Sequence, residues 1–206
     1  GSEMCIRDSL YLAIEGKLAA VICVEDPLRE EAADAVRELK EAGITKVVMM
    51  TGDSERTAAA IAKRVGVDEY YSEVLPEDKA SFVEKEKELG HKVIMIGDGI
   101  NDSLALSSAS VGIAISDGAA IAREIADVTI SADNLHEIVT LKRLSTALMK
   151  RIHNNYRTII GINGGLIALG VTGIIMPTTS ALLHNMSTLT ISLRSMRNLL
   201  PKEEEA

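Results

Sequence analysis

The residues with the clearest chemical potential form the hexapeptide at positions 97–102, which reads Gly-Asp-Gly-Ile-Asn-Asp and directly follows an apolar stretch. Its two carboxylates, Asp98 and Asp102, can hold a hard cation such as Mg²⁺ through oxygen. Its glycines let the backbone approach a ligand closely. The alternative interpretation is an ordinary turn, because Gly, Asn and Asp are common turn residues.

Two further segments carry groups suited to phosphate. Thr51-Gly52-Asp53 follows an apolar stretch and precedes a helical pattern, so its hydroxyl and the free N–H groups at the helix start can hold an anion. The alternative there is simple helix capping by Asp53 or Ser54. Lys79 stands just before another helical pattern, where a fixed ammonium could neutralise the charge of a transferring phosphoryl group. The alternative is a solvated surface lysine.

The elements that must position these residues alternate between short apolar strands and amphipathic helices from Leu10 to about Ser131. Alternation of this kind predicts an α/β fold, in which a parallel sheet is covered by helices on both faces. Ligands of such sheets bind at the carboxyl ends of the strands, where the turns at Thr51 and Gly97 both lie. The predicted strands are 18–24, 46–50, 93–96, 111–115 and 128–130, and the predicted helices include one from Asp26-Pro27 to Glu41 and one over 55–65.

The composition changes after Asn134. A basic helical stretch is followed by an uncharged run from Ile159 to Met176, which at about 1.5 Å per residue nearly crosses a hydrocarbon core of roughly 30 Å. Pro177 to Thr179 is expected to form a break before a second uncharged run, Ser180 to Leu193. Basic residues flank only the outer ends, which predicts a helical hairpin with both ends in the cytoplasm. The alternative is a buried helix pair of a soluble protein.

The glycines of the first run, at positions 161, 164, 165, 170 and 173, suit close packing of helices in lipid. The predicted organisation is therefore a domain over residues 10–136 and a membrane hairpin over 137–200. Residues 1–9 are expected to be artefactual or disordered, and residues 201–206 to form a disordered tail.

The order of the three motifs, TGD, then PxxK, then GDGxND, resembles the haloacid dehalogenase-like phosphotransferases in the version used by P-type ATPases. Residues 17–29 and 111–116 also resemble the heavy-metal branch of that family, and the resemblance extends from about Leu10 to Leu200. It implies a Rossmann-like parallel sheet flanked by helices, followed by a transmembrane helical hairpin. It also implies ATP-driven transport of a heavy-metal cation through an aspartyl-phosphate intermediate.

The resemblance also implies a role for each matching residue. Thr51, with Gly52 and Asp53 beside it, is expected to bind the phosphate, and Lys79 to balance its charge. Mg²⁺ is expected at Asp98 and Asp102, with Asn101 ordering the site around metal and phosphate. ATP is the expected substrate of the full-length protein.

The nucleophile of that family is the first aspartate of a DKTGT motif, which this sequence does not contain. We therefore expect a sheet that lacks one strand, beside the Asp98 strand or the Thr51 strand, and no phosphoenzyme from this chain by itself, because covalent catalysis needs that carboxylate. The alternatives are a non-catalytic, membrane-bound module that binds Mg²⁺ and phosphate, and a soluble phosphatase of the same superfamily. The absent nucleophile and the apolar hairpin argue against the phosphatase.

Polar residues in the predicted hairpin are candidates for binding the transported ion: Asn163, His184, Asn185, Ser187 and Thr188. Neutral imidazole suits Zn²⁺ and Co²⁺, and the run 184–188 is similar to the His-Glu-Gly-Gly-Thr helix of cobalt or zinc exporters, with Asn in place of Glu. The expected cargo is a divalent ion of the zinc, cadmium, cobalt or manganese class. The alternative is hydrogen bonding between the helices alone.

The expected location is a plasma or inner membrane, which the chain crosses more than once, with the domain at 10–136 and the C-terminus in the cytoplasm. The formal charge of −8 argues against nucleic acid as a partner, since such binding needs a basic face.

Overall fold

The computed structural model describes residues 8–14, 16–24, 28–97, 101–115, 124–130 and 134–199. The chain divides into two compact units, Gly1–Val139 and Thr140–Ala206, each of which is described by itself. The boundary lies three residues beyond the predicted position 136, inside a helix that begins at His136. Three residues of the hexapeptide at 97–102, Asp98 among them, lie outside the described residues.

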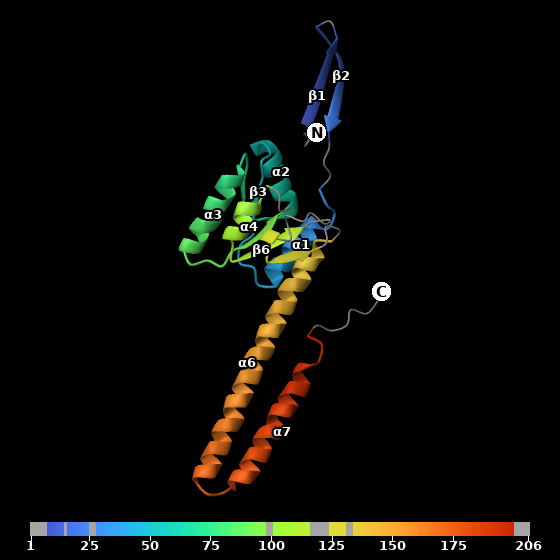
Figure 1. Cartoon of the computed structure of the whole chain (residues 1–206). Helices are drawn as coiled ribbons and strands as arrows, with labels where there is room; N and C mark the ends of the chain where they lie inside the picture. The colour runs from blue at the N-terminus through green and yellow to red at the C-terminus, as the bar shows by residue number, and fades with distance from the viewer. Residues whose placement is uncertain are drawn as a thin grey trace, which may run out of the picture. The chain divides into compact units, whose positions relative to one another are not determined.

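The first unit opens with a hairpin that the sequence analysis interpreted differently. Strands β1 (Asp8–Ile14) and β2 (Lys17–Val24) pair antiparallel in a two-stranded sheet of their own (Figure 1). The prediction of 18–24 as a strand of the parallel sheet was therefore wrong. A connection as short as the one through Gly16 can join only antiparallel strands. The hairpin also begins at Asp8, which pairs with Val24, so Asp8 and Ser9 belong to a strand rather than to a disordered segment.

The other strands form two parallel sheets in place of the single sheet that was expected. Strand β3 (Val48–Met50) pairs with β4 (Glu69–Tyr71), and β5 (Ile94–Gly97), β6 (Val111–Ile115) and β7 (Val128–Ile130) form the second sheet in that order. Among the described residues, β3 and β5 each pair along one edge only. These are the strands that precede the Thr51 turn and the hexapeptide, and the missing strand beside them stays a prediction.

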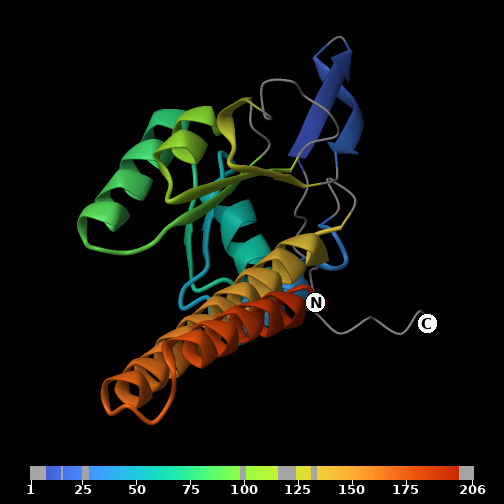
Figure 2. The same ribbon diagram turned by 60° about the horizontal axis from the view of Figure 1, so that its bottom comes forward.

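Helices alternate with these strands: α1 (Ala32–Glu41), α2 (Glu55–Val65), α3 (Pro76–Glu88) and the short α4 (Ser103–Ser108). Helix α1 begins later than predicted, and Asp26-Pro27, the predicted start, lies outside the described residues. Figure 2 shows α3 and α4 on one face of the strands and α2 on the other, which agrees with the predicted covering of both faces.

The ends of these helices follow from their sequence. Helix α2 stops at Gly66, which takes the left-handed conformation with φ 79° that glycine adopts without steric cost. Helix α3 starts with Pro76, whose fixed φ suits the first helical position. The Asp78 carboxylate accepts a hydrogen bond from the backbone N–H of Leu75 at 3.3 Å and completes that helix start.

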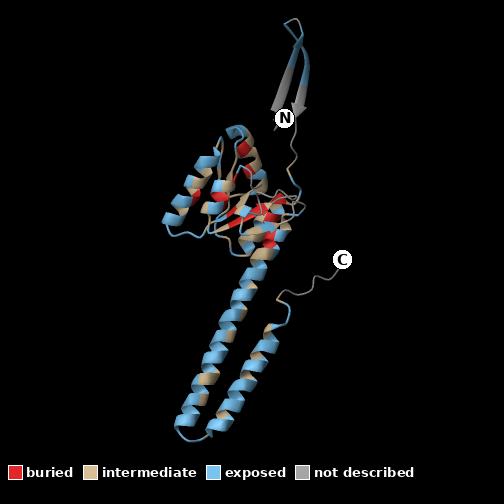
Figure 3. Ribbon diagram, viewed as in Figure 1, coloured by how far each residue is buried: buried red, intermediate tan, exposed pale blue. Residues whose placement is uncertain are grey.

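One core connects the two sheets. Val83 of α3, Met95 of β5 and Leu106 of α4 are buried together with Ala105, and Met50 of β3 packs against them (Figure 3 shows the buried positions gathered in this unit). The rings of Tyr71 in β4 and Phe82 in α3 lie 5.1 Å apart and add a second link. The strands that lead to the candidate site are thus held by one set of apolar contacts. Among the described residues, β3 and β5 belong to different sheets, and no strand is paired with both of them.

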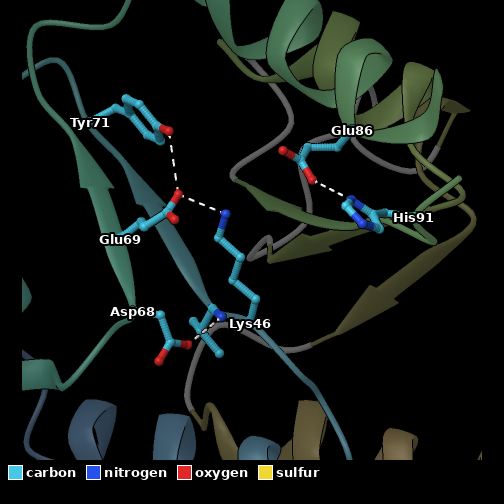
Figure 4. A network of polar contacts seen from close by, with 7 residues as sticks. Lys46, Asp68, Glu69, Tyr71, Glu86 and His91 are labelled. Atoms are coloured by element: carbon cyan, nitrogen blue, oxygen red, sulfur yellow. Dashed lines mark hydrogen bonds and ion pairs between the residues drawn. The ribbon is translucent and has the colours of Figure 1, made fainter. Parts of the chain in front are cut away.

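Polar contacts fix the start of β3 against β4 (Figure 4). The Asp68 carboxylate accepts a hydrogen bond from the N–H of Val47 and pairs with Lys40, both at 2.7 Å. The pKa of Asp68 is lowered by the hydrogen bond from Lys40 and then by that from Val47. Lys46 forms a 2.7 Å ion pair with Glu69, whose hydrogen bond raises the pKa of Lys46.

The second unit is built from two helices, α6 (His136–Val171), which begins in the first unit, and α7 (Pro177–Ser195). The predicted break at Pro177–Thr179 was wrong, because Pro177 is the first residue of α7, a position that tolerates its missing N–H. The chain turns instead between Thr172 and Met176. Gly173, at φ 74°, allows this turn by ending α6 in the left-handed conformation.

Within the part of the chain that the structure describes, none of the helices has both the length and the apolar character needed to cross a membrane. The predicted transmembrane hairpin is therefore not confirmed. The reason lies in where α6 ends: the uncharged run from Ile159 continues to Met176, but the helix stops at Val171, and its earlier turns carry Arg151 and Arg157.

The close helix packing expected at the glycines is also not seen in this chain. A Cβ added at Gly161, Gly164, Gly165 or Gly170 would have no atom within 4 Å apart from its own helix and chain neighbours. Large apolar side chains of both helices and of the turn between them are exposed in the second unit, including Ile167, Val171, Ile174 and Leu182 (Figure 3).

Candidate functional site

A buried ion pair lies at the centre of the candidate site. The Lys79 ammonium is 2.8 Å from the Asp102 carboxylate, and both side chains are mostly buried, with 15% and 12% of their surface exposed. Asp102 is the one buried charged residue among the described residues. Lys79 comes from the first turn of α3, and Asp102 directly precedes α4, so two helix starts bring the opposite charges together.

Gly97 makes room for the Asp102 carboxylate. A Cβ added to Gly97 would lie 2.7 Å from the Cβ of Asp102 and 2.9 Å from its Cγ, both of which are closer than real side chains approach. The sequence analysis assigned the glycines of the hexapeptide to close approach of a ligand. At Gly97 the group that takes the space is a side chain of the same motif.

The turn after β3 is held at both ends. Thr51 donates a hydrogen bond from its hydroxyl to the Asp53 carboxylate at 2.7 Å and accepts one from the Asp53 N–H at 3.1 Å. The loop that follows β4 pairs with the same turn, because the Val74 N–H donates to the Thr51 carbonyl and the Glu73 N–H donates to the Asp53 carbonyl. Glu73 takes a left-handed φ of 53° at this point. The Thr51 hydroxyl is thus fixed at the carboxyl end of its strand.

These predicted site residues fall into two described groups. One is the Lys79–Asp102 pair beside Gly97 at the end of β5, and the other is the Thr51–Asp53 turn at the end of β3. The two strands share the core around Met95, but no described hydrogen bond or ion pair joins the two groups. Asn101 is exposed, Gly52 has open space around it, and Asp98 lies outside the described residues.

A supporting contact was missed by the sequence analysis. The Glu55 carboxylate, in the first turn of α2, accepts hydrogen bonds from the Ser72 hydroxyl at 2.5 Å and the Tyr70 hydroxyl at 2.8 Å. The bond from Ser72, and then that from Tyr70, lowers the pKa of Glu55. These contacts tie the helix that follows the Thr51 turn to strand β4. A strand as short as Glu-Tyr-Tyr has too little apolar pattern for a sequence to reveal it.

The candidate ion ligands form a second, separate group in the second unit. His184 of α7 and Asn163 of α6 are joined by a 2.9 Å hydrogen bond between ring nitrogen Nδ1 and the amide oxygen. The hydroxyls of Ser187 and Thr188 both donate to the His184 backbone carbonyl, at 2.7 and 3.0 Å. Asn185 lies on the same helix. The described residues contain no group of three or more His, Cys, Asp or Glu side chains that could hold a metal ion.

Residues 6–110 match the family described as haloacid dehalogenase-like hydrolase. The chain belongs to the haloacid dehalogenase-like hydrolase family. The match covers half of the chain, including the Thr51 turn, Lys79 and the hexapeptide, while the second unit lies beyond it.

Among curated proteins, this haloacid dehalogenase-like chain is similar to P-type ATPases that move heavy metals. It is 37% identical over 189 residues to a zinc-exporting P-type ATPase of Mycobacterium marinum, covering 91% of this chain and 26% of the relative. It is 44% identical over 177 residues to copper-transporting ATPase 2 of Rhizobium meliloti, covering 86% of this chain and 21% of that relative. The chain thus spans about a quarter of the length of these relatives.

The fold matches a solved crystal structure over both units. A zinc-transporting PIB-type ATPase in its E2.Pi state superposes with a TM-score of 0.84 at 31% identity, covering 95% of this chain and 32% of the solved one. The likeness of this haloacid dehalogenase-like chain to ATP-hydrolysing ion transporters therefore extends past its hydrolase domain into the two long helices.

Proposed function

We propose that the chain is the C-terminal part of a P-type ATPase that transports a heavy-metal cation. The observation that carries the proposal is the Lys79–Asp102 ion pair, set against Gly97 at the carboxyl end of β5. Acidic and basic groups at such strand ends are where α/β proteins bind ligands. The superposition of 95% of the chain on a zinc-transporting ATPase supports the same proposal.

Each residue takes a role that its surroundings allow. The Thr51 hydroxyl, fixed by Asp53, would hydrogen-bond a phosphoryl oxygen, with the N–H groups at the start of α2 behind it. Lys79 would offset the negative charge of the phosphoryl group, and its burial strengthens that effect because solvent screens it less. Asn101, exposed at the end of the hexapeptide, would complete the polar lining.

The residues present fit Mg²⁺. The Asp102 carboxylate supplies the oxygen ligands that this ion prefers, and Mg²⁺ is commonly held by one or two carboxylates while it retains several waters. Asp102 and Asp98 would hold the ion, which when bound neutralises charge on phosphate oxygens. Lys79 would hold the Asp102 carboxylate in place in the meantime. ATP would be the substrate of the full-length protein.

We propose further that the carboxylate that accepts the phosphoryl group belongs to a part of the protein outside these 206 residues. The open edges of β3 and β5, which share the core around Met95, support this proposal, since both strands lead to predicted phosphate-binding turns. A parallel strand placed between them would extend both sheets and bring its own carboxyl end to the same site.

The helices α6 and α7 are proposed to form a membrane hairpin of the full-length protein. Their exposed apolar side chains and the absence of charge between Ile159 and Met176 support the proposal. Asn163 and His184 join across the pair and would face the transported ion. The proposed cargo is a divalent ion of the zinc, cadmium, cobalt or manganese class, of which an imidazole suits Zn²⁺ and similar borderline ions best. The likeness to the Rhizobium protein keeps copper among the candidates to be assayed.

The phosphate pocket is tested by calorimetry of orthovanadate binding to the 206-residue chain in detergent, with and without Mg²⁺. We expect binding that requires Mg²⁺, is lost in Asp98→Ala and is weakened about tenfold or more in Lys79→Met, a change of roughly 1.4 kcal/mol. Lys85→Met, which removes an exposed lysine of the same helix, is the matched control and should bind as the wild type does. Mg²⁺-independent binding, or equal weakening by both lysine variants, would contradict the assignment.

The transport function is tested on the full-length protein, expressed from a gene that includes the coding sequence upstream of this chain. If that sequence contains a DKTGT motif in frame, the full-length protein should hydrolyse ATP when one of Zn²⁺, Cd²⁺, Co²⁺, Mn²⁺ or Cu⁺ is present. His184→Ala should change which metal stimulates hydrolysis more than it changes the basal rate. An upstream sequence without the motif would favour a non-catalytic module that binds Mg²⁺ and phosphate.

A further inference from the structure

The end of the second unit where α7 stops contains a cavity lined by basic side chains. Its volume is about 350 Å³, and its lining includes Lys150, Arg151, Arg194 and Arg197. Two of these cations come from α6, one from the last turn of α7, and one from just beyond it. The proposed phosphoryl site lies in the other unit and uses none of them.

Arg151 links α6 to the end of α7 at this cavity. Its guanidinium donates hydrogen bonds to the backbone carbonyls of Ser195 at 3.0 Å and Asn198 at 2.9 Å, and also to that of Arg197. Asn155, one turn along α6, donates to the Ser195 hydroxyl at 2.7 Å. These bonds satisfy carbonyls that a helix C-terminus otherwise leaves exposed, and they neutralise the partial negative charge that would repel an anion there.

Among the residues that the structure describes, the other three cations have no carboxylate partner; Glu203, Glu204 and Glu205 lie outside them. The sequence from Thr140 to Leu200 contains seven Lys and Arg residues and no Asp or Glu: Lys142, Arg143, Lys150, Arg151, Arg157, Arg194 and Arg197. Among the described residues, no ion pair involves Lys150, Arg194 or Arg197, whose residues are all exposed. Cations that converge on one cavity without a counter-charge favour an anion with several oxygens, and arginine suits phosphate in particular.

Apolar residues indicate the kind of phosphate: Ala147 and Leu199 line the cavity itself, and exposed apolar residues stand beside its cations in the sequence. Leu193 and Met196, the sequence neighbours of Arg194 and Arg197, are 59% and 80% exposed, and Ile152 beside Arg151 is 48% exposed. A free phosphate ion gains nothing from contact with apolar side chains, whereas a molecule with a phosphate head and hydrocarbon chains would cover them. We propose that this basic cavity binds the phosphate group of an anionic phospholipid, and this choice of source depends on the membrane hairpin proposed above.

The test is native mass spectrometry of the 206-residue chain released from detergent in the presence of equal amounts of phosphatidylglycerol and phosphatidylcholine. We expect adducts with phosphatidylglycerol to exceed those with phosphatidylcholine about tenfold. The double variant Arg194→Gln/Arg197→Gln should lose that preference. Lys142→Gln/Arg157→Gln, which removes the same charge from α6 outside the cavity, should keep it.

Three results would overturn the proposal. Equal adducts with both lipids in the wild type would show that no anionic head group is selected. Equal loss of preference in both double variants would show that the lipid is attracted by the net charge of the chain and not by a specific binding site. Displacement of phosphatidylglycerol by inorganic phosphate at an equal concentration would show that the apolar neighbours contribute nothing and that the ligand is a free phosphate.

A separate measurement distinguishes this inference from the proposed membrane hairpin. If the chain, expressed in cells, is released from their membranes by alkaline carbonate, the hairpin proposal fails whatever the lipid result. If the chain stays in the membrane fraction and shows no preference for phosphatidylglycerol, only the lipid site fails.

Discussion

At the scale of single residues, the site depends on how closely a carboxylate can approach a strand. Asp102 reaches its buried position because Gly97 has no side chain, and Lys79 compensates the charge that burial would otherwise penalise. The sequence analysis identified all three residues as parts of motifs. It did not predict that Lys79 and Asp102 pair directly, because nothing in the spacing of two distant motifs fixes a contact between their side chains.

Substitution of Gly97 tests this close approach. Gly97→Ala would place a methyl group 2.7 Å from the Cβ of Asp102, so the strand or the ion pair must shift. We expect the free energy of unfolding to fall by about 1–3 kcal/mol, the range for overpacked interiors. Gly52→Ala is the matched control, since a methyl group there meets no atom within 4 Å. Chemical denaturation of both variants measures the difference, and equal stability would show that the space at Gly97 is not required.

At the scale of elements, the helices and most strands were predictable because their apolar residues repeat with a helix or strand period. The hairpin of β1 and β2 was not, since a single apolar stretch such as 18–24 does not reveal whether its neighbour in the sheet is parallel or antiparallel. The three-residue strand β4 was missed for lack of pattern, and its position is set by contacts from other elements. The break between α6 and α7 was misplaced because Pro177 starts a helix as readily as it interrupts one.

The contact between α2 and the loop after β4 predicts how stability depends on pH. The Ser72 hydroxyl lowers the pKa of Glu55 in the folded protein, so the contact stabilises the fold when pH is above the unfolded pKa of Glu55 and the benefit is lost as pH falls through the folded pKa. Thermal unfolding should therefore show Ser72→Ala less stable than the wild type at pH 7 and the gap closing toward pH 3.

The matched control for this pH series is Ser81→Ala. The Ser81 hydroxyl donates to the Glu77 backbone carbonyl, which does not titrate, so its effect on the melting temperature should be the same at both ends of the series. A gap for Ser72→Ala that stays constant with pH would show that the bond to Glu55 does not govern the effect.

At the scale of the whole molecule, the described chain consists of two units that share one helix. The first turn of α6 belongs to the hydrolase unit, where Ile138 and Val139 are buried and His136 lies 3.4 Å from Glu38 of α1. From Thr140 onward the same helix belongs to the second unit. The sequence analysis predicts a domain boundary at position 136, because the apolar pattern of the sheet ends there and a basic stretch begins.

Substitutions on the two sides of the boundary should therefore differ in their effect on the stability of the hydrolase unit. Val139→Ala removes buried methyl groups from the hydrolase unit, where Val139 is 1% exposed, and should lower its stability by about 2 kcal/mol. Leu144→Ala lies about one turn further along α6, where the side chain is 37% exposed, and should change that stability by less than about 0.5 kcal/mol. Hydrogen exchange of the β5 and β6 amides reports the effect, and equal protection in both variants would contradict the division.

The open edges of β3 and β5 have a practical consequence for anyone who expresses this chain alone. A strand whose N–H and C=O groups lack a partner accepts a strand from another molecule as readily as one of its own. At the concentrations reached in a bacterial host, the strands available for pairing are those of other copies of this chain. We therefore expect inclusion bodies and a soluble yield that falls as the expression level rises. A synthetic peptide with the sequence of the strand that we propose to lie between β3 and β5, added during refolding, should compete with that self-association and recover monomer.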